Sequence, residues 1–110
     1  MPLFKLTVLS LRGKVYEGEA ESVALPGLQG RFSVLAHHAP MIAALAAGAS
    51  TVRDAAGEHL FFTSSGYAEV TREEVVVLVG MAQKVASMDE VASLRSEHEQ
   101  LLSSADMPPP

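Results

Sequence analysis

The stretch GRFSVLAHHAPMIAALAAG, residues 30–48, places two adjacent histidines and a proline between two short apolar segments. Similar β-rich runs, separated by turn residues, extend in both directions from about residue 3 to about residue 85. Two of them, KVYEGE (14–19) and ESVALP (21–26), lie directly upstream. Strands at this spacing, with no helical period between them, predict a mainly β domain that forms an antiparallel sandwich or barrel.

The predicted strands differ in the number of their apolar faces. In FKLTV (4–8), the polar residues Lys5 and Thr7 alternate with apolar ones, which predicts one wet face. By contrast, EVVVLVG (74–80) and HLFFTS (59–64) are apolar on both faces. Two explanations stay open for these runs: central strands that the chain itself covers on both sides, or an outer face that another subunit covers.

A helical pattern replaces the β pattern after Lys84. Ser87 and Glu90 have the spacing of a capping box, in which each side chain bonds to a free backbone amide of the first turn. An apolar stripe follows at spacings of three and four: Met88, Val91, Leu94, His98, Leu101 and Leu102. We therefore expect a β-sandwich domain over residues 1–86, a single helix over 87–104 and a flexible proline-rich tail over 105–110.

The composition narrows the class of protein. The 110 residues are 48% hydrophobic and 19% charged, with a net charge of -5. These values favour one folded domain and exclude a basic surface for nucleic acid. There is no cysteine, which excludes disulfides and thiol nucleophiles. No export signal is expected at the N-terminus, and the longest uncharged stretch (32–52) is interrupted by proline and glycine, so any membrane association is expected to be indirect.

No pattern in the chain indicates catalysis. The four histidines, at positions 37, 38, 59 and 98, have no metal-ligand spacing. Ser64 and Ser65 precede a glycine but lack the G-x-S-x-G surroundings of a hydrolase nucleophile, so a hydrolase that pairs either serine with His38 is not favoured. We expect no catalytic residue, no metal and no cofactor.

The order of motifs over residues 13–53, GKVYEGEAESVALPGLQGRFSVLAHHAPMIAALAAGASTVR, resembles the signature region of the epsilon subunit of the rotary ATP synthase. The matching residues, in order and without insertions, are Gly13, Val15, Tyr16, Gly18, Val23, Pro26, Gly27, Gly30, Phe32, Val34, Leu35, His38, Ala39, Pro40 and Gly48. Further on, SSGYAEV (64–70) resembles the family's S-G-G-[FIY]-x-E-V. The resemblance covers residues 4 to about 93.

This resemblance implies a fold and a role. The fold is an N-terminal sandwich of two antiparallel sheets followed by a C-terminal helical part. The role is that of a non-catalytic central-stalk subunit of a proton- or sodium-driven ATP synthase, peripheral on the cytoplasmic face of the membrane. Such a subunit binds the gamma subunit, rests on the polar loops of the c-ring and transmits rotation to the catalytic head complex.

The resemblance also implies contact residues. The turns around positions 29–32 and 37–40 are expected to face the c-ring or to lie beside gamma, through Gln29, Gly30, Arg31, Phe32, His37, His38, Ala39 and Pro40. The residues expected to face gamma are Ser10, Ala43, Val75 and Val77. Pro40 would hold Ala39 extended and stiffen the second turn. A simple turn role for His38, with no partner, stays open.

Two departures from the family pattern bear on mechanism. Gln29 and Arg31 stand in a turn where the family often has an acidic residue, so an exposed ion pair with the ring is expected to be absent or reversed. MDEVAS (88–93) aligns with the family's nucleotide-binding I-D-x-x-R-A, retaining Asp89 but with Ala92 in place of the arginine. No nucleotide binding is therefore expected. With room for one helix before Pro110, inhibition by helix extension is not expected either.

A different class of function remains as the alternative. A free-standing β-sandwich that binds a small ligand would be a monomer with a pocket of convergent polar groups. The central-stalk interpretation predicts instead a flat apolar outer face around residues 74–80. The sequence does not identify the coupling ion or the face that meets gamma.

Overall fold

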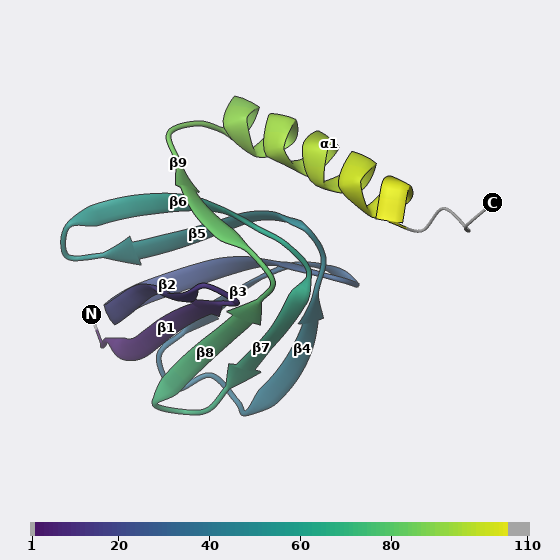
Figure 1. Ribbon diagram of the computed structural model, residues 1–110. Helices are drawn as coiled ribbons and strands as arrows, with labels where there is room; N and C mark the ends of the chain where they lie inside the picture. Colours follow the sequence, from purple (N-terminus) through teal and green to yellow (C-terminus); the bar gives the residue numbers. More distant parts are fainter. Residues whose placement is uncertain (1, 106–110) are drawn as a thin grey trace.

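A computed structural model describes residues 2–105 and the side chains of residues 2–101 (Figure 1). In this part of the chain, nine strands precede one helix. The strands are β1 (Phe4–Ser10), β2 (Gly13–Gly27), β3 (Gly30–Leu35), β4 (Met41–Leu45), β5 (Gly48–Asp54), β6 (Gly57–Thr63), β7 (Gly66–Val70), β8 (Glu74–Val79) and β9 (Ala82–Val85), and the helix is α1 (Met88–Ala105). The prediction of a mainly β domain followed by one C-terminal helix is confirmed.

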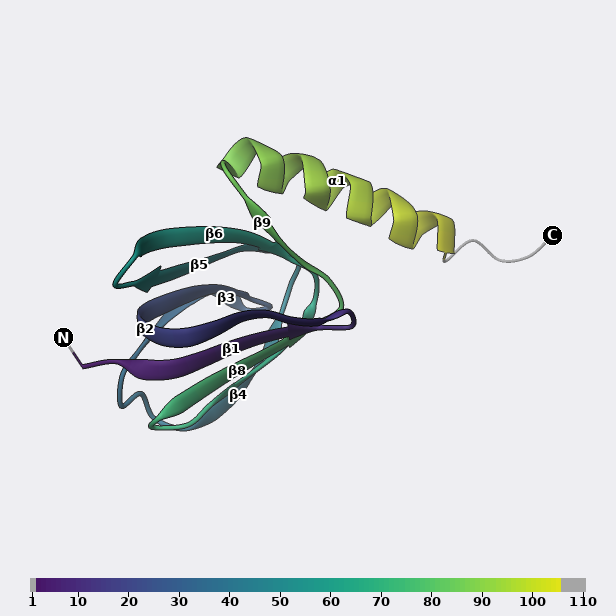
Figure 2. The ribbon, with the colours of Figure 1, turned by 60° about the vertical axis from the view of Figure 1, so that its left-hand side comes forward.

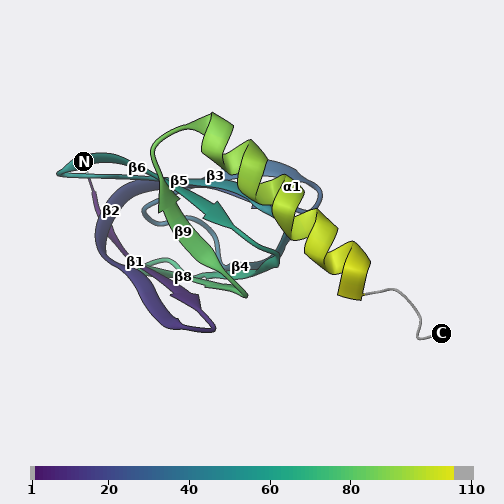
Figure 3. The ribbon, with the colours of Figure 1, turned by 45° about the horizontal axis from the view of Figure 1, so that its top comes forward.

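The strands form two packed layers that share β2 (Figure 2). The first layer contains β4, β7, β8, β1 and the first half of β2, and the second contains the rest of β2 with β3, β5, β6 and β9. β2 bends sharply between the layers, where its pairing register shifts between Ala20 and Ser22 (Figure 3). A bulge of this kind lets one strand turn the corner of a sandwich.

Two details differ from the expected sandwich of two antiparallel sheets. The hydrogen-bonded ladder is continuous through β2, because KVYEGE and ESVALP are halves of one 15-residue strand rather than two strands. In addition, β1 and β8 pair in parallel, with Leu6 beside Val75. The long connection from β1 to β8 makes this possible, since parallel neighbours need a crossover rather than a tight turn.

Alternating side chains of both layers fill the space between them. Phe4, Leu6 and Val8 of β1 point inward, as do Val23 and Leu25 of β2. The expected wet face of β1 is only partly present: Lys5 is exposed, but Thr7 is 8% exposed. Thr7 lies between Glu17 of β2 and Val76 of β8, whose side chains flank it on the outer side of the layer.

The helix covers the outer side of the second layer. Val91 and Leu94 of α1 pack with Ala49 and Val85 around the fully buried Phe62. Half of the predicted capping box is present: the Glu90 N–H donates to the Ser87 hydroxyl at 3.3 Å, but within the described side chains Glu90 does not accept from the Ser87 N–H in return.

Only part of the predicted apolar stripe packs. Met88 and Leu101 are exposed, and the side chain of Leu102 lies outside the described part. For Leu101 the reason is visible in Figures 1 and 3, because the second half of α1, which contains this residue, runs beyond the strands. Of the predicted tail, Ala105 is the last helical residue and residues 106–110 lie outside the described residues.

No helix within residues 2–105 has both the length and the apolar character needed to cross a membrane.

Candidate partner-binding surfaces

The two turns expected to contact partners lie at opposite ends of β3. Leu28 and Gln29 form the β2–β3 turn, whereas residues 36–40 connect β3 to β4. A six-residue strand spans about 17 Å. The eight predicted contact residues therefore do not form one surface at a single end of the sandwich, as they would have to if all of them met the c-ring together.

The β2–β3 turn presents Leu28 and Gln29 to solvent, and both are exposed. Gly30 follows at φ 133°, in the region of backbone conformation that favours glycine. Arg31 does not extend from the tip. Its guanidinium lies along β5, where Nη1 donates to the Ala49 carbonyl at 2.6 Å and Nη2 donates to the Thr51 hydroxyl at 3.2 Å.

The histidine turn is held by backbone hydrogen bonds. The His37 N–H donates to the Arg72 carbonyl at 3.1 Å, which ties this turn to the β7–β8 turn. His37 has φ 65°, the left-handed conformation that costs a residue with a Cβ atom about 1–2 kcal/mol. Nδ1 of His38 lies 2.8 Å from the Ala39 carbonyl, which can only accept, so Nδ1 carries the proton. Among residues 2–105, no group of three ligating side chains could hold a metal.

The outer side of the first layer exposes large apolar side chains. Ile42 of β4 is 73% exposed, Tyr67 of β7 is 59% exposed and Leu78 of β8 is 49% exposed. The pairing register puts Leu78 beside Tyr67, and Val76 of the same strand beside Glu69, which in turn neighbours Ile42. We call Ile42, Tyr67, Val76 and Leu78 the outer apolar face.

The register changes which residues of β8 can meet a partner. Val75 and Val77, expected to face gamma, are 1% and 0% exposed and pack in the core between the layers. Sequence reasoning chose the wrong alternation for this strand, because EVVVLVG is apolar at both sets of positions. The neighbouring Val76 and Leu78 point outward instead.

The other two residues expected to face gamma have different settings. The Ser10 hydroxyl donates to the Gly13 carbonyl at 3.2 Å and accepts from the Arg12 N–H at 3.2 Å, so it closes the β1–β2 turn. Ala43 lies half-buried in β4 and lines a hollow of about 390 Å³ between the β2–β3 turn and β4. Leu28 and Ile42 border the same hollow, which therefore continues the outer apolar face toward the turn.

This hollow does not favour a small-ligand site. Among the described residues that line it, Gln29 alone has a polar side chain, whereas ligand pockets usually bring several polar groups together. The structure also does not support a hydrolase that pairs Ser64 with His38, because these residues lie near opposite ends of β7. The Ser64 hydroxyl instead accepts a hydrogen bond from the Met81 N–H at 2.8 Å.

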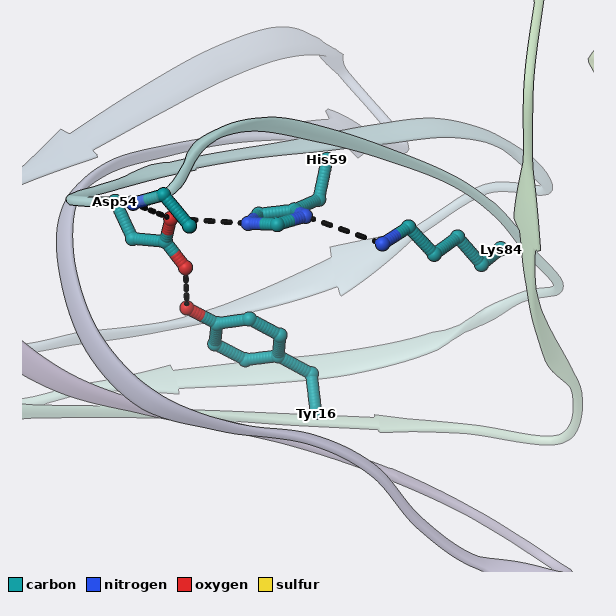
Figure 4. Close-up of polar contacts among 5 residues, drawn as sticks. Tyr16, Asp54, His59 and Lys84 are labelled. Atoms are coloured by element: carbon teal, nitrogen blue, oxygen red, sulfur yellow. Dashed lines mark hydrogen bonds and ion pairs between the residues drawn. The ribbon is translucent and has the colours of Figure 1, made fainter.

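A polar network that sequence reasoning missed lies at the open side between the layers (Figure 4). The Tyr16 hydroxyl donates to Oδ2 of Asp54 at 2.6 Å, and Nε2 of His59 donates to Oδ1 at 2.9 Å. Nζ of Lys84 donates to Nδ1 of His59 at 3.3 Å. Since an ammonium group can only donate, Nδ1 accepts and the imidazole proton lies on Nε2.

The network shifts the acidity of two of its members. Burial, and then the hydrogen bond and the charge of Asp54, raise the pKa of Tyr16 to about 12. Hydrogen bonds from Tyr16 and His59 lower the pKa of Asp54 to about 2. The four residues come from β2, β5, β6 and β9 and bond to one another, which indicates a structural link between the layers. Their spacing in sequence, 16, 54, 59 and 84, gave no local signal.

Comparisons with known proteins agree with this architecture. The family model for the β-sandwich domain of the ATP synthase delta/epsilon chain matches residues 3–85. The ATP synthase epsilon chain of Propionigenium modestum, described as sodium ion specific, is 36% identical over 89 residues, covering 81% of this chain and 65% of that one. The epsilon chain of Helicobacter acinonychis is 44% identical over 78 residues, covering 71% and 63%. This chain thus spans slightly less than two thirds of the length of both relatives.

Solved structures give the same fold. A chain in the cryo-EM structure of the Euglena gracilis mitochondrial ATP synthase, OSCP/F1/c-ring, superposes with a TM-score of 0.74 at 20% identity, covering 99% of this chain and 70% of that one. That similarity concerns the fold. The family model covers most of the chain, including the strands that carry the outer apolar face and both turns. The chain therefore belongs to the family of ATP synthase delta/epsilon chains.

Proposed function

We propose that this chain is a non-catalytic central-stalk subunit of a proton- or sodium-driven ATP synthase. It binds the gamma subunit and contacts the c-ring, so that ring rotation is coupled to ATP synthesis in the head complex. It reaches the cytoplasmic face of the membrane only through these partners. Family membership supports the assignment, and the observation that carries it is the outer apolar face.

The gamma subunit binds the outer apolar face. Tyr67 and Leu78 stand side by side on neighbouring strands, and Ile42 extends the surface onto β4. Large exposed apolar groups that lie together on a rigid sheet mark a contact surface. Val76 and Leu78 replace Val75 and Val77 in this assignment. Ala43 lines the hollow that adjoins the surface, whereas Ser10 closes the β1–β2 turn.

The two turns contact different partners. Leu28 and Gln29, at the exposed tip of the β2–β3 turn, meet the polar loops of the c-ring. Arg31 is held on β5 and supports the turn from behind rather than forming an ion pair with the ring. His38 and Pro40 precede β4 and lie beside gamma, because β4 carries Ile42 of the outer apolar face.

These 110 residues do not inhibit ATP hydrolysis by extending a helix into the head. The described part of α1 packs on the second layer through Val91 and Leu94, and undocking it would expose Phe62. Ala92 offers no cationic donor for a nucleotide phosphate, so nucleotide binding does not control the helix.

Native mass spectrometry of the chain mixed with the gamma subunit encoded beside it tests the main proposal. We expect a one-to-one complex. A Tyr67→Glu, Leu78→Glu double variant places two charges in the outer apolar face and should weaken this complex at least about 100-fold. Leu101→Glu, which charges an exposed leucine of α1, is the matched control and should bind gamma as the wild type does.

Arg31→Glu should also bind gamma normally, since Arg31 lies on the second layer. A chain that stays monomeric at micromolar concentrations, with no gamma bound, would contradict the central-stalk proposal and return attention to a small ligand. If the double variant binds gamma as tightly as the wild type, the central-stalk role would stand, but the outer apolar face would not be the gamma-binding surface.

The ATPase rate of the head complex, measured with and without the chain, tests the proposal that the chain does not inhibit ATP hydrolysis. The two rates should agree. Strong inhibition by the full chain that is lost when the chain is truncated at Ser87 would show that α1 does inhibit.

A further inference from the structure

A second groove lies on the opposite side of the sandwich from the outer apolar face. It runs between one flank of α1 and the loops that end β2 and begin β5, and it encloses about 340 Å³. Its floor is made of small residues, including Gly27 and the run from Ala46 to Ala49. Val91 and Met88 of α1 form one wall. Side chains of a partner could therefore approach the backbone closely.

The two cationic groups of the groove face it from different elements. Arg31 comes from β3 and Arg95 from α1. None of the described residues that line the groove is acidic, although the chain carries a net charge of -5. The acidic residues of the first helical turn, Asp89 and Glu90, line a separate hollow on another flank of α1. Neither arginine forms an ion pair with the side chains that the structure describes.

Both guanidinium groups retain donors for a ligand. Arg31 uses one N–H for the Ala49 carbonyl and one for the Thr51 hydroxyl. Within the described part of the chain, three of its five donors therefore remain for a ligand. These two bonds also fix its orientation at the edge of the groove. A guanidinium held in place in this way suits bidentate binding of a carboxylate.

We propose that this groove binds a short acidic segment of a partner protein, with its carboxylates on Arg31 and Arg95 and its small side chains on the glycine and alanine floor. An acidic segment is the ligand that complements the positive charges of Arg31 and Arg95. The volume lies near the lower end of the roughly 300–1,000 Å³ typical of ligand sites, which fits a few side chains rather than a whole helix.

Such a segment would fasten α1 to the sandwich. One arginine lies on the helix and the other on the sheet, so a ligand that bridges them adds a link to the contacts of Val91 and Leu94. Occupation of the groove would thus stabilise the docked helix, because a ligand that binds one arrangement increases its population.

An NMR titration of the full chain with an acetylated and amidated Ala-Glu-Ala-Asp-Ala peptide tests the site. Saturable shifts are expected at Gly27, Ala46 to Ala49 and Ala92, with slower amide hydrogen exchange in α1. Arg95→Gln should weaken binding about fivefold, and Arg31→Gln with Arg95→Gln at least tenfold. The same peptide with lysines in place of its acidic residues should cause no saturable shift.

Matched variants distinguish specific binding in the groove from general electrostatic attraction between the peptide and the arginines of the chain. Arg12→Gln with Arg72→Gln removes two exposed arginines outside the groove and should change the dissociation constant less than twofold. Equal losses in the two double variants, shifts spread over all the arginines, or no saturation at millimolar peptide would each overturn the proposal. Thermal unfolding of every variant identifies any loss that comes from misfolding.

The test is independent of the gamma contact. The Arg31→Gln, Arg95→Gln variant should still form the one-to-one complex with gamma, because the groove and the outer apolar face lie on different layers. Loss of peptide binding with gamma binding intact is the result that the proposal predicts for this variant.

Discussion

The two layers of the sandwich each contain a strand that is apolar on both faces, but they differ in whether the outward-pointing side chains of that strand are buried. In the second layer, β6 buries Phe61 in the core between the layers and Phe62 under α1. In the first layer, β8 buries Val77 in the core but leaves Leu78 exposed. Cover by the chain itself therefore accounts for β6, whereas cover by another subunit is the explanation that we propose for β8. Whether the chain covers its own sheet depends on where the single helix lies, and the helix follows β9 onto the second layer.

The largest expected effect comes from removing the covered aromatic ring. Phe62→Ala deletes a fully buried side chain and should lower the free energy of unfolding by about 3–5 kcal/mol. Tyr67→Ala, on the outer apolar face, should change it by no more than about 0.5 kcal/mol. Urea denaturation of both variants measures this contrast. A large loss of unfolding free energy for Tyr67→Ala would mean that the outer apolar face stabilises the isolated chain, and would count against its proposed role as a partner-binding surface.

The polar network tests whether the two layers unfold as one unit. Tyr16→Phe removes a hydrogen bond to an ionised carboxylate and should cost about 1.5–3 kcal/mol. Since Tyr16 comes from β2 and Asp54 from β5, hydrogen exchange should then increase in both layers together. An increase confined to β5 and β6 would show that the covered layer opens independently of the other.

The same network gives a pH dependence with a defined sign. The pKa of Asp54 is lowered from 3.8 to about 2, so its contribution is present above pH 3.8 and is lost as the pH falls toward 2. The pKa of Tyr16 is raised from 10.0 to about 12, so its contribution is present below pH 10 and is lost as the pH rises toward 12. Asp54→Asn should flatten the acid limb of the stability curve and Tyr16→Phe the alkaline limb; because each group also shifts the pKa of the other, each variant should flatten the second limb in part. If the stability curves of the variants keep the wild-type slope at both ends of the pH range, other titratable groups cause the pH dependence.

A smaller effect is expected at the contact between helix and sheet. Val91→Ala removes two methyl groups from the cluster around Phe62 and should cost about 1–2 kcal/mol. Amide exchange in α1 should increase more than exchange in β1 or β8. Leu101→Ala, on the part of α1 beyond the strands, is the control and should leave exchange in the first half of the helix unchanged.

Most elements of the fold follow from local sequence patterns. Turn residues separate the strands, and the Ser87 cap predicts the start of α1 to within one residue. The sequence does not reveal that β2 is one strand bent across two layers, since its bulge near Ala20 depends on the pairing with β5. Nor does it indicate β9, whose AQKV has little alternation and is a strand because it pairs with β6.

The candidate surfaces were harder to predict for a physical reason. Val75 and Val76 are chemically identical, so only the register with β1 and β7 decides which of them points out of the sandwich. Motif order placed both turns among the contact residues, but the length of β3 separates them in space. The Arg31 side chain lies on β5 because of tertiary hydrogen bonds that no local pattern encodes.

The smallest expected effect concerns the turn that leads into the open layer. His37 holds φ 65°, and its N–H is bonded to the Arg72 carbonyl, so a glycine could adopt the same backbone and keep the same bond. Relief of the left-handed strain, offset in part by the greater freedom of glycine in the unfolded chain, should make His37→Gly more stable by about 0.5–1 kcal/mol. His38→Gly is the control and should be destabilising, since His38 loses its bond to the Ala39 carbonyl without relieving any left-handed strain. If His37→Gly is more stable but binds gamma less well, the imidazole of His37 is a contact group beside the outer apolar face, and the strain is retained for binding. If stability and gamma binding both rise or stay equal, the turn only connects β3 to β4, and the partner surface of the open layer is confined to the sheet.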